Sequence, residues 1–335
     1  MLDFICLNLL VIVYHLHLFV YDCDEDEKRL FHDYGKANEL NIKVVKEPLT
    51  IQTAGLAAGS SRVSVSHRTP VTAEILSIWK RSGIHYVSTR SVGYNHIDME
   101  AAKKLNVVVD TVEYSPESVA EHTLMLMFMA LREMKSQMKR VAEQDFSLPP
   151  CRSAELRDMT VGVVGTGKIG RTVISYLKSF GCRVLAYDLY QNAEVEYVTY
   201  ETLLRKSDII TYHIPLTSET QHMLNVKNLR YLKDGCYIVN TARGALIESK
   251  ALRKVLESGK AAGAALDVVE NDEAYFYRNC KNLVIDSNLE QLCGMPNVII
   301  TPHTAFHTDH ALQDTVENTI KKSLRYEGKI EKWIS

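Results

Sequence analysis

The feature that most constrains the fold is a glycine-rich stretch at residues 161–188, VGVVGTGKIGRTVISYLKSFGCRVLAYD. An apolar run precedes the GTGKIG motif, and a helical pattern follows it and leads into a second apolar run that ends on an acid. This order of strand, glycine turn, helix and strand is typical of dinucleotide-binding folds. The stretch therefore predicts a Rossmann-type, doubly wound domain.

The glycines of this motif each have a physical role in cofactor binding. Gly165 permits the sharp turn, Gly167 lets the backbone approach a pyrophosphate, and Gly170 lets the helix pack against the strand. The helix start, with Lys168 and Ile169, offers unpaired N–H groups and a partial positive charge to the phosphates. A plainer alternative is a glycine turn within an ordinary β/α unit.

Asp188 ends the second strand of the motif. A carboxylate there can accept hydrogen bonds from an adenosine ribose, and it would repel a 2′-phosphate. We therefore expect NAD to be preferred over NADP. The alternative is a solvated acid at the end of a strand.

Length and composition limit the class of protein. The chain has 335 residues, which is enough for two domains. A net charge of −2 gives no electrostatic reason to expect a nucleic acid or membrane partner. The seven cysteines are scattered and form no C-x-x-C pair, which is typical of reduced cytoplasmic thiols rather than of disulfides or a metal site.

The first 17 residues form an apolar N-terminal extension. They carry Asp3 and no lysine or arginine, so they lack the basic region of a signal peptide. They are also shorter than the roughly 20 apolar residues that span a bilayer. We expect a non-native extension whose end contributes to the first strand.

Strand-like and helix-like patterns alternate on both sides of the glycine motif, which predicts an α/β fold with parallel sheets. A Ser-Pro-Glu sequence at 115–117 predicts the start of a long helix, and its apolar middle, 124–131, indicates a domain or subunit contact. The strands are expected at 16–21, 42–45, 63–66, 86–89, 107–110, 161–164, 183–187, 207–213, 236–240, 262–268 and 298–301.

Three reactive side chains, Arg243, Asp272 and His303, follow expected strands. Ligands of open parallel sheets bind beyond the carboxyl ends of the strands. Arginine binds a carboxylate with two parallel hydrogen bonds, histidine transfers protons near neutral pH, and a carboxylate beside it raises its pKa. Taken singly, the three could be a surface ion pair, a solvated acid and a strand cap. Together they predict hydride transfer on a 2-hydroxy acid.

Five further motifs carry a resemblance to a known family. The motifs are STRSVGYNHID at 88–98, EYSPESVAEH at 113–122, NTARG at 240–244, LDVVEND at 266–272 and PNVIITPHTAF at 296–306. With these motifs the chain resembles the D-isomer-specific 2-hydroxyacid dehydrogenases, and in particular their D-lactate dehydrogenase branch, which includes the vancomycin-resistance type. The resemblance extends from about residue 18 to residue 329.

The resemblance implies how the domains are arranged. A smaller, flavodoxin-like α/β substrate domain would comprise residues 18–109 and 306–335. The NAD-binding domain, residues 110–305, would be inserted into it. Members of the family are usually dimers, so we expect a homodimer in which the apolar helix after Pro116 contributes to the subunit contact.

The resemblance also implies residue roles. Arg243 would bind the substrate carboxylate and His303 would be the acid/base. Further substrate contacts are implied for Val92, Gly93, Tyr114 and Phe306. Cofactor contacts are implied for His213, Pro215, Thr241, Ala242 and Asp267, the last near the nicotinamide amide.

One position departs from the family pattern. The family's catalytic glutamate is the fifth residue after the aspartate that ends a strand, and here that residue is Asp272. Neither Glu270 nor Glu273 occupies that place. We expect Asp272 to assist His303, with a lower pKa of the histidine because the acid is one methylene shorter.

These observations predict an NAD-dependent D-2-hydroxyacid dehydrogenase, and the main hypothesis is a D-lactate dehydrogenase that reduces pyruvate with NADH. One alternative is the same reaction on larger 2-keto acids. A second alternative is a dinucleotide-sensing, corepressor-like binding protein of the same fold. Vancomycin-resistance relatives can lack an acid at the position of Asp188. Its presence in this chain adds to the expected preference for NADH.

Overall fold

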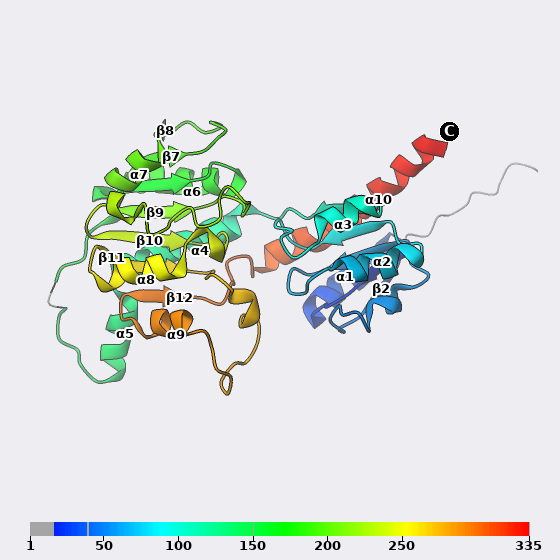
Figure 1. The fold of residues 1–335 in the computed structure, drawn as a ribbon, viewed down its shortest axis with the longest axis horizontal. Helices are drawn as coiled ribbons and strands as arrows, with labels where there is room; N and C mark the ends of the chain where they lie inside the picture. The colour runs from blue at the N-terminus through cyan, green and yellow to red at the C-terminus, as the bar shows by residue number, and fades with distance from the viewer. Residues whose placement is uncertain (1–16, 39, 150, 335) are drawn as a thin grey trace, which may run out of the picture. The chain divides into compact units, whose positions relative to one another are not determined.

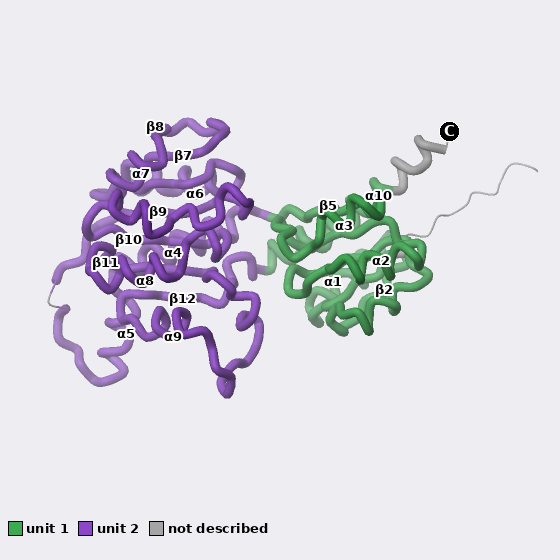
Figure 2. The backbone as a smooth tube through the Cα atoms, viewed as in Figure 1, with its two compact units in different colours: residues 1–114, 309–335 green, residues 115–308 purple. Residues whose placement is uncertain are grey.

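The computed structural model describes residues 17–38, 40–149 and 151–334, so nearly all of the apolar N-terminal extension lies outside the described residues. The chain forms two compact units (Figure 2): residues 1–114 with 309–335, and residues 115–308. The second unit is therefore an insertion in the first. Both are built from parallel strands and helices (Figure 1), which confirms the predicted two-domain α/β fold.

The first unit contains a five-stranded parallel sheet of order β2-β1-β3-β4-β5. This is the strand order of flavodoxin-like folds, as predicted. Its strands are β1 (His17–Val20), β2 (Asn41–Val44), β3 (Arg62–Val65), β4 (Tyr86–Thr89) and β5 (Val108–Thr111).

Alternate residues of these strands enter cores on opposite faces of the sheet, as the two-residue period requires. Val20 packs with Phe31 of α1 and Val316 of α10 on one face. Phe19 packs with Trp79 of α2 on the other. The helices are α1 (Glu25–Ala37), α2 (Ala73–Arg81), α3 (Met99–Lys104) and α10 (Asp309–Ile334), with the 3-10 turn η1 (Ala54–Ala57).

The second unit contains a seven-stranded parallel sheet of order β12-β11-β10-β9-β6-β7-β8. The order reverses between β9 and β6, which makes the carboxyl ends of these two strands the switch point of a Rossmann-type sheet. Its strands are β6 (Thr160–Val164), β7 (Arg183–Tyr187), β8 (Glu196–Tyr197), β9 (Ile209–Tyr212), β10 (Cys236–Asn240), β11 (Ala261–Leu266) and β12 (Val298–Ile300).

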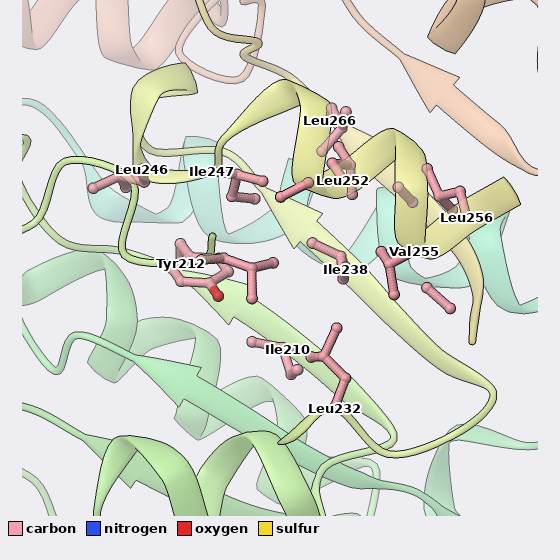
Figure 3. Packing of buried hydrophobic residues seen from close by; sticks show 14 of the residues in the cluster. Ile210, Tyr212, Leu232, Ile238, Leu246, Ile247, Leu252, Val255, Leu256 and Leu266 are labelled. Carbon is pink, nitrogen blue, oxygen red and sulfur yellow. The ribbon is translucent and has the colours of Figure 1, made fainter. Parts of the chain in front are cut away.

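Helices cover both faces of this sheet. Ile210 and Ile238 point into a core with α7, α8 and α9 (Figure 3), whereas Ile209 and Val239 point into a core with α4 and α6. The helices are α4 (Pro116–Leu131), α5 (Met134–Ala142), α6 (Lys168–Ser179), α7 (Tyr200–Lys206), α8 (Ser249–Glu257) and α9 (Ser287–Gly294), with 3-10 turns η2 (Leu156–Asp158), η3 (Leu229–Tyr231), η4 (Gly244–Leu246) and η5 (Asp272–Ala274).

Several local expectations need correction. The long helix from residue 116 ends at Leu131, because Glu133 adopts a left-handed φ of 48° and α5 begins separately. Between β9 and β10, the pattern at residues 226–232 predicts a short helix, but the structure has only the single 3-10 turn η3 there. Strand β8 and helices α7 and α9 were not anticipated, although side chains of Thr199 and Asp286 cap the two helices. Among the described helices, none has the length and apolar character to cross a bilayer.

Candidate active site

The glycine motif forms the turn between β6 and α6. Gly165 has a φ of +100°, and a Cβ there would lie 2.5 Å from the carbonyl oxygen of His213. A Cβ on Gly170 would lie 2.0 Å from the carbonyl oxygen of Gly165. Gly167 precedes the first residue of α6 and brings no side chain to the N–H groups of the first turn. These features fit the pyrophosphate of a dinucleotide.

Asp188 follows β7 and lies beside the glycine motif. Its carboxylate accepts hydrogen bonds from the Thr166 hydroxyl at 3.0 Å and the Tyr190 N–H at 2.9 Å, and also from the Thr166 N–H. Burial would raise the pKa of Asp188, but these hydrogen bonds lower it overall. The acid is therefore ionised at neutral pH, as discrimination against a 2′-phosphate requires.

His213 directly follows β9 at the switch point, two residues before Pro215. Its N–H donates to the carbonyl of Val164 at 2.7 Å, and its Nε2 lies 2.9 Å from the Thr211 hydroxyl. Burial lowers the pKa of His213 to about 3, so the ring is neutral. This position next to the glycine motif fits the expected contact with the cofactor.

Arg243 lies in the turn after β10. The Asn240 side chain shapes that turn, because its Oδ1 accepts from the Ala242 N–H at 3.0 Å and its Nδ2 donates to the Arg243 carbonyl at 2.9 Å. A Cβ on Gly244 would lie 2.0 Å from the carbonyl oxygen of Val269. The NTARG turn therefore packs directly against the loop that follows β11.

Asp272 begins the 3-10 turn η5 in that loop, and its Oδ2 accepts from the Val269 N–H at 3.0 Å. Burial and the neighbouring Glu273 raise the pKa of Asp272 to about 7, while the Val269 hydrogen bond and Arg243 act in the opposite direction. The carboxyl group is thus within electrostatic reach of Arg243.

Glu270 is committed elsewhere. It accepts from the Ser249 N–H at 3.0 Å, at the start of α8, and pairs with His222. Burial would raise the pKa of Glu270, but these contacts lower it. Glu270 is therefore already engaged by Ser249 and His222, and Asp272 stays the predicted partner of His303.

His303 follows β12 with a left-handed φ of 54°. Burial lowers the pKa of His303 to about 4; Arg243 lowers it further and Asp267 opposes the shift. The effect of the shorter acid at position 272 on the pKa of His303 stays a prediction. Arg243 acts on both Asp272 and His303, so the three side chains predicted from strand ends lie in one electrostatic environment.

Two aromatic rings flank the imidazole. The rings of Phe306 and Tyr277 lie 5.8 Å from that of His303, edge-on and tilted respectively. The Tyr277 hydroxyl also donates to the His303 carbonyl at 3.3 Å. Phe306 was predicted here, whereas Tyr277 follows an irregular acidic loop and no sequence pattern indicated it.

Asp267 holds the loop that carries His303. Its carboxylate is fully buried and accepts from the Thr301 hydroxyl at 2.6 Å and from the N–H groups of Thr304 and Ala305, both at 2.9 Å. These bonds shape the active-site loop. The contact of Asp267 with a nicotinamide amide stays a prediction.

Val92, Gly93 and Tyr114 belong to the first unit. The Ser91 hydroxyl donates to the Gly93 carbonyl at 2.6 Å and lies 2.8 Å from the Thr89 hydroxyl, so hydrogen bonds fix this loop. Val92 is exposed. The roles of Val92, Gly93 and Tyr114 in substrate binding stay predictions.

Comparisons with known proteins agree with this geometry. Residues 124–305 match the family model of the D-isomer specific 2-hydroxyacid dehydrogenase, NAD binding domain. The chain is 45% identical over 93% of its length to a D-specific alpha-keto acid dehydrogenase of Enterococcus faecium, covering 97% of that protein. It is 37% identical to a D-lactate dehydrogenase of Lactiplantibacillus plantarum, over 93% of this chain and 96% of that protein.

A solved structure gives the same result. The NAD complexed form of a D-isomer specific 2-hydroxyacid dehydrogenase from Lactobacillus delbrueckii ssp. bulgaricus superposes with a TM-score of 0.80 at 32% identity, covering 93% of this chain and 97% of that one. The cofactor is therefore NAD, and the protein is an oxidoreductase. The chain belongs to the D-isomer-specific 2-hydroxyacid dehydrogenase family.

Proposed function

We propose that the chain is a D-specific 2-keto acid reductase whose substrates extend beyond pyruvate to larger 2-keto acids. The observation that carries the reductase assignment is the close packing of the turn that holds Arg243 against the loop that holds Asp272, where a Cβ on Gly244 would lie 2.0 Å from the carbonyl oxygen of Val269. The name of the Enterococcus faecium relative, at 45% identity, favours a general keto acid over the lactate of the relative at 37%. Reduction of pyruvate alone, our main hypothesis from the sequence, becomes the second candidate.

The residues divide the chemistry as follows. Arg243 binds the carboxylate of the keto acid with two parallel hydrogen bonds. NADH, when bound, supplies the hydride that adds to C2. His303 donates a proton from its imidazolium to the oxygen on C2, and Asp272 stabilises that cation. The product is the D-2-hydroxy acid.

Binding of the substrate itself favours protonation of His303. The guanidinium of Arg243 is one of the causes of the low pKa of His303. The single negative charge of a substrate carboxylate on Arg243 compensates that positive charge, so the pKa of the imidazole rises in the complex. Keto acid binding is therefore coupled to proton uptake from the solvent.

We further propose that residues 115–308 bind the cofactor and that Val92, Gly93 and Tyr114 contact the substrate. The buried cysteines support a cytoplasmic location. A homodimer is supported by the exposed apolar side chains on α5 and the loop after it. These are Met138, Val141, Phe146 and Leu148. Leu148→Asp should then lower the sedimentation coefficient from that of a dimer to that of a monomer.

The test is oxidation of NADH by the purified protein with a panel of 2-keto acids: pyruvate, 2-ketobutyrate, 2-ketoisocaproate and phenylpyruvate. We expect a higher kcat/KM for at least one larger acid than for pyruvate, D-configured products, and weaker activity with NADPH. A preference for pyruvate over all of the others would select the D-lactate dehydrogenase. Binding of NADH without turnover of any acid would select the corepressor-like binding protein instead.

A further inference from the structure

Helix α4 holds the loop that carries His303 by two side chains on one face. Ser118 and His122 are four residues apart and therefore lie on the same side of the helix. The Ser118 hydroxyl donates to the Ala305 carbonyl at 2.7 Å. The His122 Nε2 lies 3.1 Å from the Thr301 hydroxyl and 3.3 Å from Oδ1 of Asp267. Both contacts reach the segment around the catalytic histidine.

The geometry determines which nitrogen of His122 carries hydrogen. The Thr301 hydroxyl has one hydrogen, and it donates that hydrogen to the Asp267 carboxylate at 2.6 Å. The carboxylate is an acceptor only. Both neighbours of the His122 Nε2 therefore accept, so this nitrogen is the donor.

The carboxylate that His122 contacts organises the active-site loop. Asp267 accepts from the N–H groups of Thr304 and Ala305, and its carbonyl accepts from the His303 N–H at 2.8 Å. His303 has a left-handed φ, a conformation that a non-glycine residue keeps only where surrounding bonds impose it. The orientation of the imidazole thus depends on the orientation of this carboxylate.

We propose that His122 is a positioning residue of the reductase: by donating from Nε2 it orients the Asp267 carboxylate, and through it the His303 imidazole. The proposal rests on the proposed role of His303. The next residue of α4, Thr123, has its hydroxyl 2.8 Å from that of Thr241 in the NTARG turn. One helix therefore holds both the loop of the acid/base and the loop of the carboxylate-binding arginine.

The test compares His122→Leu, His122→Gln and His122→Asn in the full-length protein. Leucine removes the donor, glutamine places an amide N–H near the position of Nε2, and asparagine is too short to reach it. We expect leucine and asparagine to lower kcat for keto acid reduction roughly 10- to 100-fold, while KM for NADH and for the keto acid changes less than about threefold. Glutamine should recover most of kcat.

Glu121→Gln is the matched control, because Glu121 is the exposed neighbour on α4 and should leave kcat unchanged. Equal kcat values for the leucine, asparagine and glutamine variants would overturn the proposal. If the leucine variant does not fold, the two amide variants still decide it. Turnover retained by His303→Gln would instead overturn the role of His303, and with it the proposed function, whatever the His122 variants do.

Discussion

In each of the two units, a charged residue directly after a strand of the sheet holds the neighbouring loops, and the two charges have opposite sign. In the first unit, Arg90 directly follows β4, and its guanidinium donates to the carbonyls of Tyr21 and Asp22 at 2.8 and 2.9 Å. In the second unit, Asp267 directly follows β11, and its carboxylate accepts from two loop N–H groups. In the first unit a buried cation, Arg90, thus binds backbone carbonyls. In the second unit a buried anion, Asp267, binds backbone N–H groups.

The two charges differ in how they are balanced. Arg90 forms a buried ion pair with Glu27, and their side chains are only 2% and 10% exposed. Asp267 is stabilised by hydrogen bonds from His122, Thr301 and two loop N–H groups, and those bonds keep its pKa low although burial would raise it. We therefore expect the stability of the first unit to fall when one charged partner is lost. The stability of the second unit should fall at low pH.

The largest effect is expected for Arg90→Met. It leaves Glu27 buried without its partner, which costs about 3–5 kcal/mol of the free energy of unfolding. Urea denaturation should report this loss, while the affinity for NADH under native conditions stays unchanged. Arg90→Met combined with Glu27→Leu should recover much of the stability. A double variant no more stable than the single one would argue against the buried pair as the cause.

A smaller effect is expected for Asp267→Asn, whose single carbonyl oxygen leaves a buried N–H without an acceptor, at a cost of about 1–3 kcal/mol. Because the folded-state pKa of Asp267 is lowered, its stabilisation is present above the ordinary pKa of about 3.9 and is lost as the pH falls further. The melting temperature of the wild type should therefore drop more steeply below pH 4 than that of the variant. Parallel curves would refute this account.

The third prediction concerns Asp272, the predicted partner of His303. Asp272→Glu adds a methylene and should bring the carboxylate closer to the imidazole, so the pKa of His303 should rise. The alkaline limb of kcat/KM for keto acid reduction should move upward by about one pH unit. The measurement is the pH profile of NADH oxidation between pH 5 and 10. An unchanged profile would argue against Asp272 as the partner of His303.

The smallest effect is expected at Asp188, an acid that also follows a strand but lies at the partly exposed end of β7. Asp188→Ser should change stability by only about 1 kcal/mol, because the hydroxyl can still accept a hydrogen bond from the local backbone. The ratio of kcat/KM for NADH to that for NADPH should fall roughly tenfold, which corresponds to about 1.4 kcal/mol. A ratio equal to that of the wild type would show that Asp188 does not select the cofactor.

Much of the fold could be read from local pattern. The β4 range, 86–89, was predicted without error, because its residues, YVST, are all typical of buried strands or tolerated in them, and all four are buried. Helices α7 and α9 were missed because they are short and amphipathic patterns over two turns are weak. The break at Glu133 was missed because nothing in the residues near it is typical of a helix end.

The residues of the candidate site were likewise predicted only in part. Arg243, Asp272 and His303 were predicted as site residues because each follows a strand, and the carboxyl ends of parallel strands share one edge of a sheet. Tyr277 and His122 were not assigned any role. Tyr277 lies in an irregular loop, and His122 lies inside a helix whose sequence marked only its start and its burial.

Residues 161–188 alone predict the strand, glycine turn, helix and strand of the cofactor site, because φ freedom, residue period and helix start depend on neighbours along the chain. Only the folded structure shows which groups hold the loop of His303. His122 and Thr301 are 179 positions apart, yet their side chains are 3.1 Å apart. Contacts of this kind form only when the sheet and α4 have packed. Buried polar atoms are then hydrogen-bonded to partners on the neighbouring elements, however distant these are in sequence.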